Sequence, residues 1–489
     1  MVVKRTSALI LSLCACLAGS ACTRLENRQS GWPEHLASGV GNHAASARVN
    51  PQGSASGALV TEQMLTSGPH NARETSMAVQ GNNPLHAVAA IMGDASNKGI
   101  DTAATFDGGL NWTLGNIPQA AGAVFEADPM LAIDAQGIAY LAHIPVDSFT
   151  NTNLGIDVHR SLDGGLTWTP MVRLTNDAVP RDARDDKVAI AVDDHPGSPY
   201  FGNVYVAWKL PPGPMFFARS SNQGLSWTGP ITIPSLGVAG LDLATAEDGT
   251  VLLSFNQGFA DGVTRLNIQV QRSTDQGDSW QAPAQIALNR SAFNIQPAGA
   301  CNAPGAHVQT SLGLRLAAHP LGRSMWVSWN DYLPGVPFNC SKVCSAANTC
   351  RSGVYISHSD DLGLTWSTPE RVPGLDAVAG DQFFSWADVD AQTGELLVAF
   401  KDTARDPNRM LADVVLRRSA DGSVWQAPVT LSGAASTTTS TFQGDYVGMA
   451  AAGGHAYMAW PDYRNRPLGD FYVASANFDA IFQDGFDAN

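Results

Sequence analysis

The sequence has few charged residues. Asp, Glu, Lys and Arg make up 15% of its 489 residues, against about 25% in an average soluble domain. Coiled coils and long helical bundles need more charge, and disordered chains have fewer apolar residues than the 44% present, so these classes are excluded. Basic residues are the minority charge, at 29 against 44 acidic residues, and the net charge is −15. Nucleic acid is not an expected partner, because phosphate binding needs a basic surface.

Long apolar runs are also missing. The apolar stretch near the start, residues 8–18, follows two basic residues and precedes three small residues and Cys22. This pattern predicts a secretory signal that is too short to span a bilayer, and no later run approaches the ~18 residues of a membrane span. The chain is therefore expected to be exported. Two alternatives stay open: a lipid anchor on Cys22 in the cell envelope, or cleavage before Cys22 and free secretion.

Cysteine is scarce outside the signal. Three of the seven cysteines lie in or at the signal, and the others are Cys301, Cys340, Cys344 and Cys350. An even number in an exported chain predicts two disulfides, with three possible pairings. Zinc binding is the rival interpretation, but the spacing lacks the close ligand pairs and the nearby His of a zinc site.

Turn formers and aromatic residues, in contrast, are frequent, with 47 Gly, 28 Pro and 12 Trp. They favour an all-β protein of short strands. One pattern, S/T-x-D-x-G-x-x-W, recurs six times, and the sixth copy is one residue short. The copies are TFDGGLNW (105–112), SLDGGLTW (161–168), SSNQGLSW (220–227), STDQGDSW (273–280), SDDLGLTW (359–366) and SADGSVW (419–425). The Asp position of the pattern is occupied by Asp107, Asp163, Asn222, Asp275, Asp361 and Asp421, so Asn replaces Asp in the third copy.

The chemistry of this repeat predicts a structural turn. The Asp side chain is expected to accept hydrogen bonds from the backbone of a tight turn, and Gly supplies the positive φ that the turn needs. The Trp is expected to pack between neighbouring sheets. We therefore interpret the six acidic positions as structural and not as catalytic.

The regions between the repeats contain further predicted strands, which together with the strands on either side of each repeat turn make units of four strands. A short strand ending in an aromatic residue precedes most copies, as in VYVAW (204–208), and a further β-like stretch precedes that strand. Four antiparallel strands form the blade of a β-propeller. Seven units begin near residues 75, 126, 184, 239, 307, 380 and 441. We predict a single all-β propeller of seven four-stranded blades, with six blades as the alternative.

The signal pattern, the composition of the segment that follows it and the repeats together predict the domain boundaries. We predict a signal peptide at 1–21, a flexible tether at 22–57, the β-propeller at 58–478 and a C-terminal tail at 479–489. The last unit lacks the repeat, so its outer strand is predicted to come from residues 58–65, which would close the ring. A single closed ring is expected to be a monomer.

The repeat resembles the Asp box, or BNR repeat, of sialidases and related β-propellers. Four further elements are similar to those of bacterial exported sialidase-like proteins: ETS-x-AV (74–79), ADP (127–129), DK-x-x-IAVD (186–193) and GDY-x-G (444–448). The resemblance implies the propeller fold and a location outside the cytoplasm. It does not extend to the F/Y-R-I-P motif that carries the first Arg of sialidases, because the corresponding strand reads RETSM (73–77).

Polar residues concentrate in the loops that enter each innermost strand and in those that leave each second strand. Antiparallel pairing places both sets of loops at one end of the ring, opposite the six repeat turns. A carboxyl of raised pKa at this end could protonate a sugar leaving group while a second group attacks, and basic residues could bind an anionic substrate. The catalytic candidates are Glu74, Asp128, Asp186 and Tyr446. The substrate-binding candidates are Arg184, Lys187, Asp331, Asp381, Asp402, Asp445, Asp462 and Arg464.

These residues favour a glycoside hydrolase that acts on extracellular glycans or glycoproteins, and an exo-sialidase-like one if the resemblance extends to activity. The alternative is a non-catalytic propeller that binds glycan or protein at the cell surface. Nucleophile-elbow, zinc-protease, phosphate-loop and EF-hand motifs are absent from the sequence. No cofactor is expected, and calcium is the metal that a carboxylate-rich end would suit.

Overall fold

The structure is a computed structural model, and it describes part of the chain. The described residues are 48–49, 58–66, 72–92, 99–117, 119–146, 154–175, 185–210, 213–237, 240–259, 266–289, 294–295, 308–309, 315–318, 322–334, 351–375, 380–438 and 443–478. Within them every regular element is a β-strand. No helix in this part of the chain is long and apolar enough to cross a membrane.

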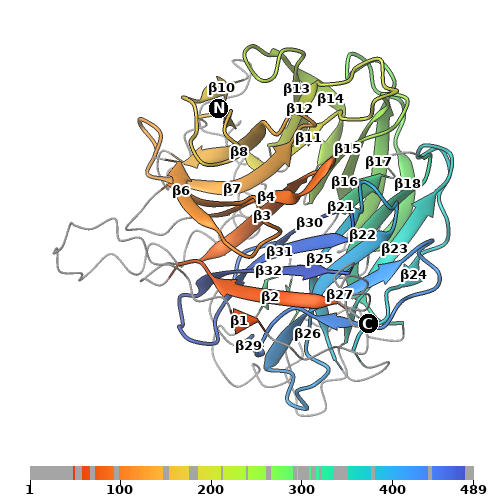
Figure 1. Cartoon of the computed structure of the whole chain (residues 1–489). Helices are drawn as coiled ribbons and strands as arrows, with labels where there is room; N and C mark the ends of the chain where they lie inside the picture. Colours follow the sequence, from red (N-terminus) through yellow and green to blue (C-terminus); the bar gives the residue numbers. More distant parts are fainter. Residues whose placement is uncertain are drawn as a thin grey trace, which may run out of the picture. The chain divides into compact units, whose positions relative to one another are not determined.

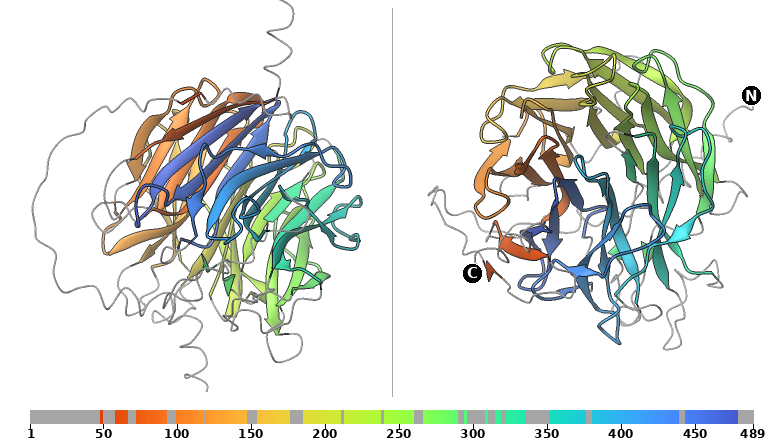
Figure 2. Two further views of the ribbon diagram at one scale, coloured as in Figure 1. Left: turned by 90° about the horizontal axis from the view of Figure 1, so that it is seen from below. Right: turned by 45° about the vertical axis from the view of Figure 1, so that its right-hand side comes forward.

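Seven antiparallel sheets form the blades of a β-propeller, which confirms the predicted fold and the count of seven (Figures 1 and 2). The first blade contains β3 (Arg73–Gln80), β4 (Asn83–Met92), β5 (Ile100–Thr105) and β6 (Thr113–Ile117). The second contains β7 (Phe125–Ile133), β8 (Ala139–Val146), β9 (Ile156–Ser161) and β10 (Val172–Leu174). The third contains β11 (Asp186–Val192), β12 (Val204–Lys209), β13 (Gly213–Ser220) and β14 (Thr228–Gly237).

The next three blades repeat this order. The fourth contains β15 (Leu241–Thr245), β16 (Val251–Phe259), β17 (Leu266–Ser273) and β18 (Ala284–Asn289). The fifth contains β21 (Arg315–Ala318), β22 (Met325–Tyr332), β23 (Ser352–Ser359) and β24 (Glu370–Arg371). The sixth contains β25 (Gln382–Val389), β26 (Leu396–Asp402), β27 (Leu411–Ser419) and β28 (Val429–Thr430), and β29 (Ser436–Thr437) also pairs with β27. A separate two-stranded sheet joins β19 (Asn294–Ile295) and β20 (Val308–Gln309).

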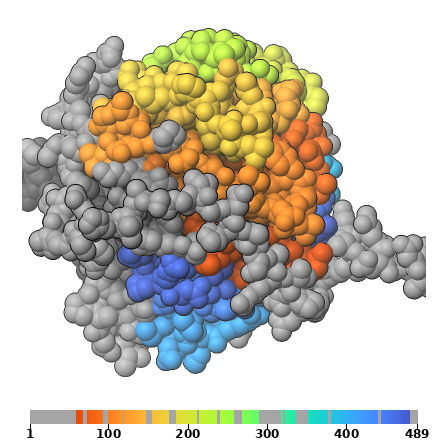
Figure 3. Space-filling model, turned by 60° about the vertical axis from the view of Figure 1, so that its left-hand side comes forward, coloured from red at the N-terminus to blue at the C-terminus, as the bar shows by residue number. Residues whose placement is uncertain are grey.

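The seventh blade joins the two ends of the described chain. It contains β30 (Gly448–Ala452), β31 (His455–Asp462) and β32 (Asp470–Asn477) from the C-terminal side. Its outer strands are β2 (Leu59–Met64) and the short β1 (Arg48–Val49) from the N-terminal side. The predicted closing strand is thus present, and β1 lies within the segment that was expected to be a tether. In the space-filling view the blue surface of this blade borders the red and orange surface of the first blade (Figure 3).

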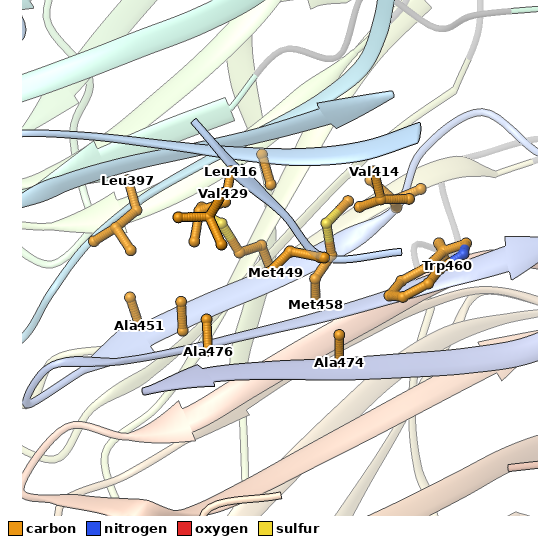
Figure 4. Close-up of a cluster of buried hydrophobic side chains, with 14 of the residues drawn as sticks. Leu397, Val414, Leu416, Val429, Met449, Ala451, Met458, Trp460, Ala474 and Ala476 are labelled. Atoms are coloured by element: carbon orange, nitrogen blue, oxygen red, sulfur yellow. The ribbon is translucent and has the colours of Figure 1, made fainter. Parts of the chain in front are cut away.

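Hydrophobic cores lie between successive blades, because each sheet is covered on both faces. Along β30, Met449 and Ala451 pack with Leu397 of the sixth blade (Figure 4), whereas Ala450 packs with Met77 of the first. Successive side chains of a strand point to opposite faces, so one strand supplies two cores. A strand with both faces buried must be almost continuously apolar. This explains why so little of the chain is charged.

The six repeats form similar turns between the third and fourth strands of the first six blades. In the second blade, Asp163 Oδ1 accepts hydrogen bonds from Ser161 Oγ at 2.7 Å and from the Thr167 amide at 2.8 Å. Gly165 has φ of 93°, and a Cβ there would lie 2.6 Å from the side chain of Val88 in the first blade. Only glycine fits such a position.

Each repeat Trp contacts the blade that precedes its own around the ring. Trp168 packs against the first blade, where its indole N–H donates to Thr102 Oγ1 at 3.3 Å. Trp280 meets Phe217 of the third blade edge to face, with ring centroids 5.3 Å apart. The side chains of the repeats therefore act within turns and between blades.

Candidate functional site

Charged residues occupy strained backbone positions where three of the innermost strands begin. Glu74, Asp128 and Lys187 have φ values of 45°, 52° and 50°, and Phe384 of the sixth blade has 53°. Each lies at a register shift between the first and second strands of its blade. A left-handed backbone at a residue other than glycine costs on the order of 1 kcal/mol or more, and such positions cluster at functional sites. The bulge recurs in four blades, but only the first three carry a charged residue there.

Lys187 is the centre of this group. Its Nζ lies 2.5 Å from a carboxylate oxygen of Asp445, 3.3 Å from Asp128 and 3.9 Å from Glu74. It lies 4.0 Å from Asp186, which also accepts a hydrogen bond from Lys209 at 3.0 Å. The first, second, third and seventh blades all contribute, so the group lies where blades meet at the end of the ring opposite the repeat turns. We call Glu74, Asp128, Asp186, Lys187 and Asp445 the lysine cluster.

The lysine cluster is buried at one side and open at the other. Glu74 and Asp128 are buried, while Lys187 and Asp445 are slightly more accessible. The Asp186 side chain is 39% exposed and is the part of the cluster most accessible to solvent.

Burial and charge move the cluster's carboxyl groups in opposite directions. Burial, reinforced by the negative charge of Asp128, raises the pKa of Glu74 well above its ordinary value, and the two carboxyls share a hydrogen bond. Burial also raises the pKa of Asp445, although Lys187 opposes the shift. For Asp186, the charges of Lys209 and Lys187 overcome the effect of burial and lower the pKa to about 2. The shifts therefore favour the protonated form of Glu74 and the ionised form of Asp186.

The same carboxylates keep Lys187 charged. Burial disfavours its ammonium, but attraction to Asp128, Asp445, Asp186 and Glu74 outweighs burial and raises the pKa of Lys187 well above its ordinary value.

Tyr446 forms an aromatic wall beside Lys187. Its ring centroid lies 5.6 Å from Lys187 Nζ and 6.3 Å from the ring of Trp386. Tyr446 is only 2% exposed, and its hydroxyl donates a hydrogen bond to the carbonyl oxygen of Pro129 at 3.4 Å. A cation above an aromatic face is stabilised by the ring quadrupole. In this arrangement Tyr446 supports the lysine and does not present its hydroxyl to solvent.

Several other predicted residues lie at equivalent strand ends but outside the lysine cluster. Asp381 binds Arg409 at 2.8 Å, and both side chains are buried. Asp402 accepts hydrogen bonds from the amides of Leu375 and Ala404, at 3.0 and 2.8 Å. These carboxylates hold loops and strands together in the fifth and sixth blades.

The same holds in the seventh blade. Asp462 accepts a hydrogen bond from the Trp460 indole at 2.8 Å and pairs with Arg464 at 2.7 Å. Arg464 also pairs with Glu62 of β2 at 2.7 Å, so it ties the closing strand to the ring.

Asp331 of the fifth blade accepts a hydrogen bond from the Tyr332 amide at 2.6 Å. The remaining predicted residues, Arg184, Cys22, Cys301, Cys340, Cys344 and Cys350, lie outside the described residues.

A second polar group was missed by the sequence analysis. Glu126, His143 and Asp157 converge inside the second blade, and all three are fully buried. His159 stacks on His143 with ring centroids 5.2 Å apart, and Arg173 pairs with both carboxylate oxygens of Asp157. Burial raises the pKa of Glu126 to about 7 and lowers the pKa of His143 to about 4. The only signal in the sequence was the alternation of Asp157 and His159 along one strand.

Comparison with known proteins supports the fold. The structure is similar to the BP39L lectin from Burkholderia pseudomallei, with a TM-score of 0.52 and 11% identity over 84% of this chain and 97% of that chain. It also matches the Hadza microbial sialidase Hz136, with a TM-score of 0.46 and 15% identity over 78% and 74% of the two chains. A leech intramolecular trans-sialidase matches with a TM-score of 0.44 and 11% identity over 72% and 69%. No family model and no curated protein matches the sequence.

Identities this low show a shared fold and nothing finer. The chain is thus a β-propeller, and the lectin match covers almost the whole of that protein.

Proposed function

We propose that the protein is a propeller glycoside hydrolase that acts on extracellular glycans, with the lysine cluster as its reacting centre. One observation carries the proposal. Glu74, whose pKa is raised, and Asp186, whose pKa is lowered, both lie within 4.0 Å of Lys187 Nζ. Two carboxyl groups with pKa values pushed apart are the arrangement that glycosidases use for acid and nucleophile or base.

The pKa shifts and the exposure of the two carboxyl groups support a separate role for each. The raised pKa of Glu74 favours its protonated form, so it would donate its proton to the glycosidic oxygen as the bond to the leaving sugar breaks. Asp186 is ionised and the most exposed of the cluster, so it would attack the anomeric carbon or activate a water molecule. Each carboxyl has an oxygen within 4.0 Å of Lys187 Nζ, so these two oxygens are no more than about 8 Å apart. This limit allows the retaining separation and the shorter part of the inverting range.

Exo-sialidase activity is the form of the proposal that the sequence resemblance favours. It requires basic groups for the carboxylate of the sugar. Arg464 and Arg409 are paired with acidic residues of their own or neighbouring strands, and Lys187 is surrounded by carboxylates. Sialosides therefore belong in the substrate screen beside neutral glycosides, with neither class assumed.

Glycan binding without turnover is the second candidate. The observation that favours it is the burial of Tyr446, whose hydroxyl is bonded to a backbone carbonyl and is not placed to attack a substrate. The similarity to a lectin concerns the fold and is compatible with either candidate.

A screen of fluorogenic glycosides, including sialosides, tests both candidates. Wild type is compared with Glu74→Gln, Asp186→Asn and the control Asp360→Asn, an exposed carboxylate in a repeat turn. Hydrolysis should fall by roughly 10²- to 10⁴-fold in the first two variants and stay unchanged in the control. Turnover that survives Glu74→Gln and Asp186→Asn rejects this site. If no glycoside is cleaved, specific retention on a glycan array selects the binding candidate, and absence of both rejects a glycan role.

Export is a further part of the proposal. The support is the N-terminal pattern of two basic residues, an apolar stretch and Cys22. Expression in a Gram-negative host with fractionation should place the mature chain outside the cytoplasm. Retention in the membrane fraction that is lost in Cys22→Ala would select the lipid anchor, and a soluble exported chain would select ordinary cleavage. Recovery of the intact chain in the cytoplasm would contradict export.

A further inference from the structure

A row of polar side chains crosses the second blade on the face that packs toward the first. Leu141 of β8 lies in the core shared with Ala78 and Val88 of the first blade, and His143 is two residues further on the same strand. Alternate residues of a strand share a face. Asp157 of β9 is the cross-strand partner of His143, and Glu126 comes from β7 on the other side. Three adjacent strands therefore bring an imidazole and two carboxylates together.

The row contains buried polar atoms that no hydrogen bond satisfies. Within the described residues, neither ring nitrogen of His143 has a hydrogen-bond partner, and neither has Glu126 Oε2. His143 Nδ1 lies 3.0 Å from Glu126 Oε2, but the two groups are not oriented as donor and acceptor. A buried polar group without a hydrogen-bond partner destabilises the folded protein. Other buried histidines differ: both ring nitrogens of His86 are hydrogen-bonded, to Gln80 and to the Gly164 carbonyl.

The spacing suits a metal ion. One ligand atom from each of Glu126, His143 and Asp157 lies within 4.8 Å of the other two. Ligands on a tetrahedral zinc ion are roughly 3.4 Å apart, as follows from metal–ligand bonds of about 2.1 Å. Zinc sites with three protein ligands complete their coordination with water. A small contraction of these side chains would therefore form such a site.

Neighbouring groups already hold the three side chains in place. Arg173 binds Asp157 through two hydrogen bonds, at 2.6 and 2.7 Å. The amide of Ala120 donates to the other carboxylate oxygen of Glu126, at 2.6 Å. Such outer contacts orient metal ligands and are a regular part of metal sites.

We propose that Glu126, His143 and Asp157 bind one divalent transition-metal ion, with zinc as the expected ion. Zinc accepts both imidazole and carboxylate ligands, whereas calcium and magnesium prefer sites made wholly of oxygen. The ion would join β7, β8 and β9. It would also fix β7 two residues before Asp128 of the lysine cluster. The site is independent of the proposed hydrolase activity.

Metal analysis of the full chain tests the proposal. Protein refolded with Zn²⁺ and then exchanged into metal-free buffer should retain one equivalent more zinc than the Glu126→Gln and His143→Gln variants. The control is His86→Gln, a buried histidine outside the site, which should retain as much zinc as wild type. Circular dichroism establishes that each variant is folded. Glu126→Gln keeps the test valid if His143→Gln does not fold.

Cobalt distinguishes this site from the cysteines of the chain. Co²⁺ bound to nitrogen and oxygen ligands should give weak visible absorption without thiolate charge-transfer bands, and this absorption should disappear in Glu126→Gln. Added Zn²⁺ should raise the melting temperature of wild type and not that of Glu126→Gln. The proposal is overturned if wild type and Glu126→Gln retain the same amount of metal, or if Ca²⁺ competes with Zn²⁺ for the site at equal concentration. The proposal would also be overturned if all the retained metal were bound by cysteine thiolates, as shown by thiolate charge-transfer bands of bound Co²⁺.

Discussion

Lys187 Nζ lies 2.5 Å from the carboxylate of Asp445, a residue 258 positions further along the chain. This ion pair joins the third blade to the loop that enters the seventh. Asp128 lies 3.3 Å from the same nitrogen, so one lysine holds carboxylates from different parts of the ring. The lysine cluster therefore has a structural role, because Lys187 neutralises carboxylates that would otherwise repel one another.

Replacing Lys187 with Met should destabilise the protein by about 3 kcal/mol, because removing one partner leaves buried carboxylates uncompensated. The free energy of unfolding in urea measures the effect. Arg405→Met is the matched control, since its guanidinium is 60% exposed and only 3.6 Å from Asp413. Exposed pairs contribute about 0–1 kcal/mol. Equal losses in the two variants would show that the cluster is not held together by Lys187.

Glu74→Gln should change how stability depends on pH. The pKa of Glu74 is raised in the folded state, so the folded protein binds this proton more tightly than the unfolded chain does. The stability from this proton is present at low pH and is lost as pH rises above the ordinary value of 4.5 toward the raised value.

Gln resembles protonated Glu and has no proton to lose, so the variant should lack this loss. The difference in unfolding free energy between Glu74→Gln and wild type should therefore grow with pH, by at most about 1.4 kcal/mol per pH unit. Urea titrations from pH 4 upward measure it, and exposed Glu370→Gln is the control. A difference that stays constant with pH would mean that Glu74 is ionised in the folded protein.

Asp163→Ala should weaken the fold without affecting any glycan activity. The substitution removes hydrogen bonds from Ser161 Oγ and from the amide and hydroxyl of Thr167, at 2.7, 2.8 and 2.6 Å. A loss of about 1–2 kcal/mol is expected, since each such bond contributes about 1 kcal/mol and the turn is partly solvated. Thermal unfolding measures it, with exposed Leu162→Ser as the neutral control. Loss of glycan turnover or binding in a folded Asp163→Ala protein would assign this turn a functional role that its geometry does not indicate.

A disulfide between β2 and β32 should lock the ring. Thr61 and Ser475 are cross-strand partners, and their hydroxyl oxygens lie 2.6 Å apart. Thr61→Cys with Ser475→Cys should form a disulfide that raises unfolding free energy by roughly 5 kcal/mol, because it closes a very long loop in the unfolded chain. Thiol titration and reducing against non-reducing melting curves measure it, with each single Cys variant as control. If the pair stays reduced under oxidising conditions, β2 does not pair with β32 in this register.

Much of the fold could be predicted because it repeats. Six copies of one turn and the strands between them imply four-stranded units, and a seventh unit without the turn predicted the closing strand that β2 supplies. Local hydrogen bonding in a short turn and alternation along a strand act over a few residues, so they are visible in sequence.

The composition of the candidate site was only partly predictable. Glu74, Asp128 and Lys187 were expected at the end of the ring opposite the repeat turns, as were Asp381 and Asp462, and the strand order places them there. The structure brings the first three together, but it pairs Asp381 with Arg409 and Asp462 with Arg464. Strand position alone cannot distinguish these cases, because the nearest cation comes from a different part of the chain.

The sequence by itself determined that this chain is an all-β propeller of four-stranded blades and which end of the ring is polar, because short-range chemistry repeated along the chain specifies each blade. It favoured seven blades over six, and the structure settled the count. Only the tertiary structure decided which charges meet. Closing the ring brings Lys187 within reach of Asp445, and stacking three strands buries Glu126, His143 and Asp157 together. Both groups depend on electrostatic interactions that act over a few ångströms in space, between residues far apart in sequence.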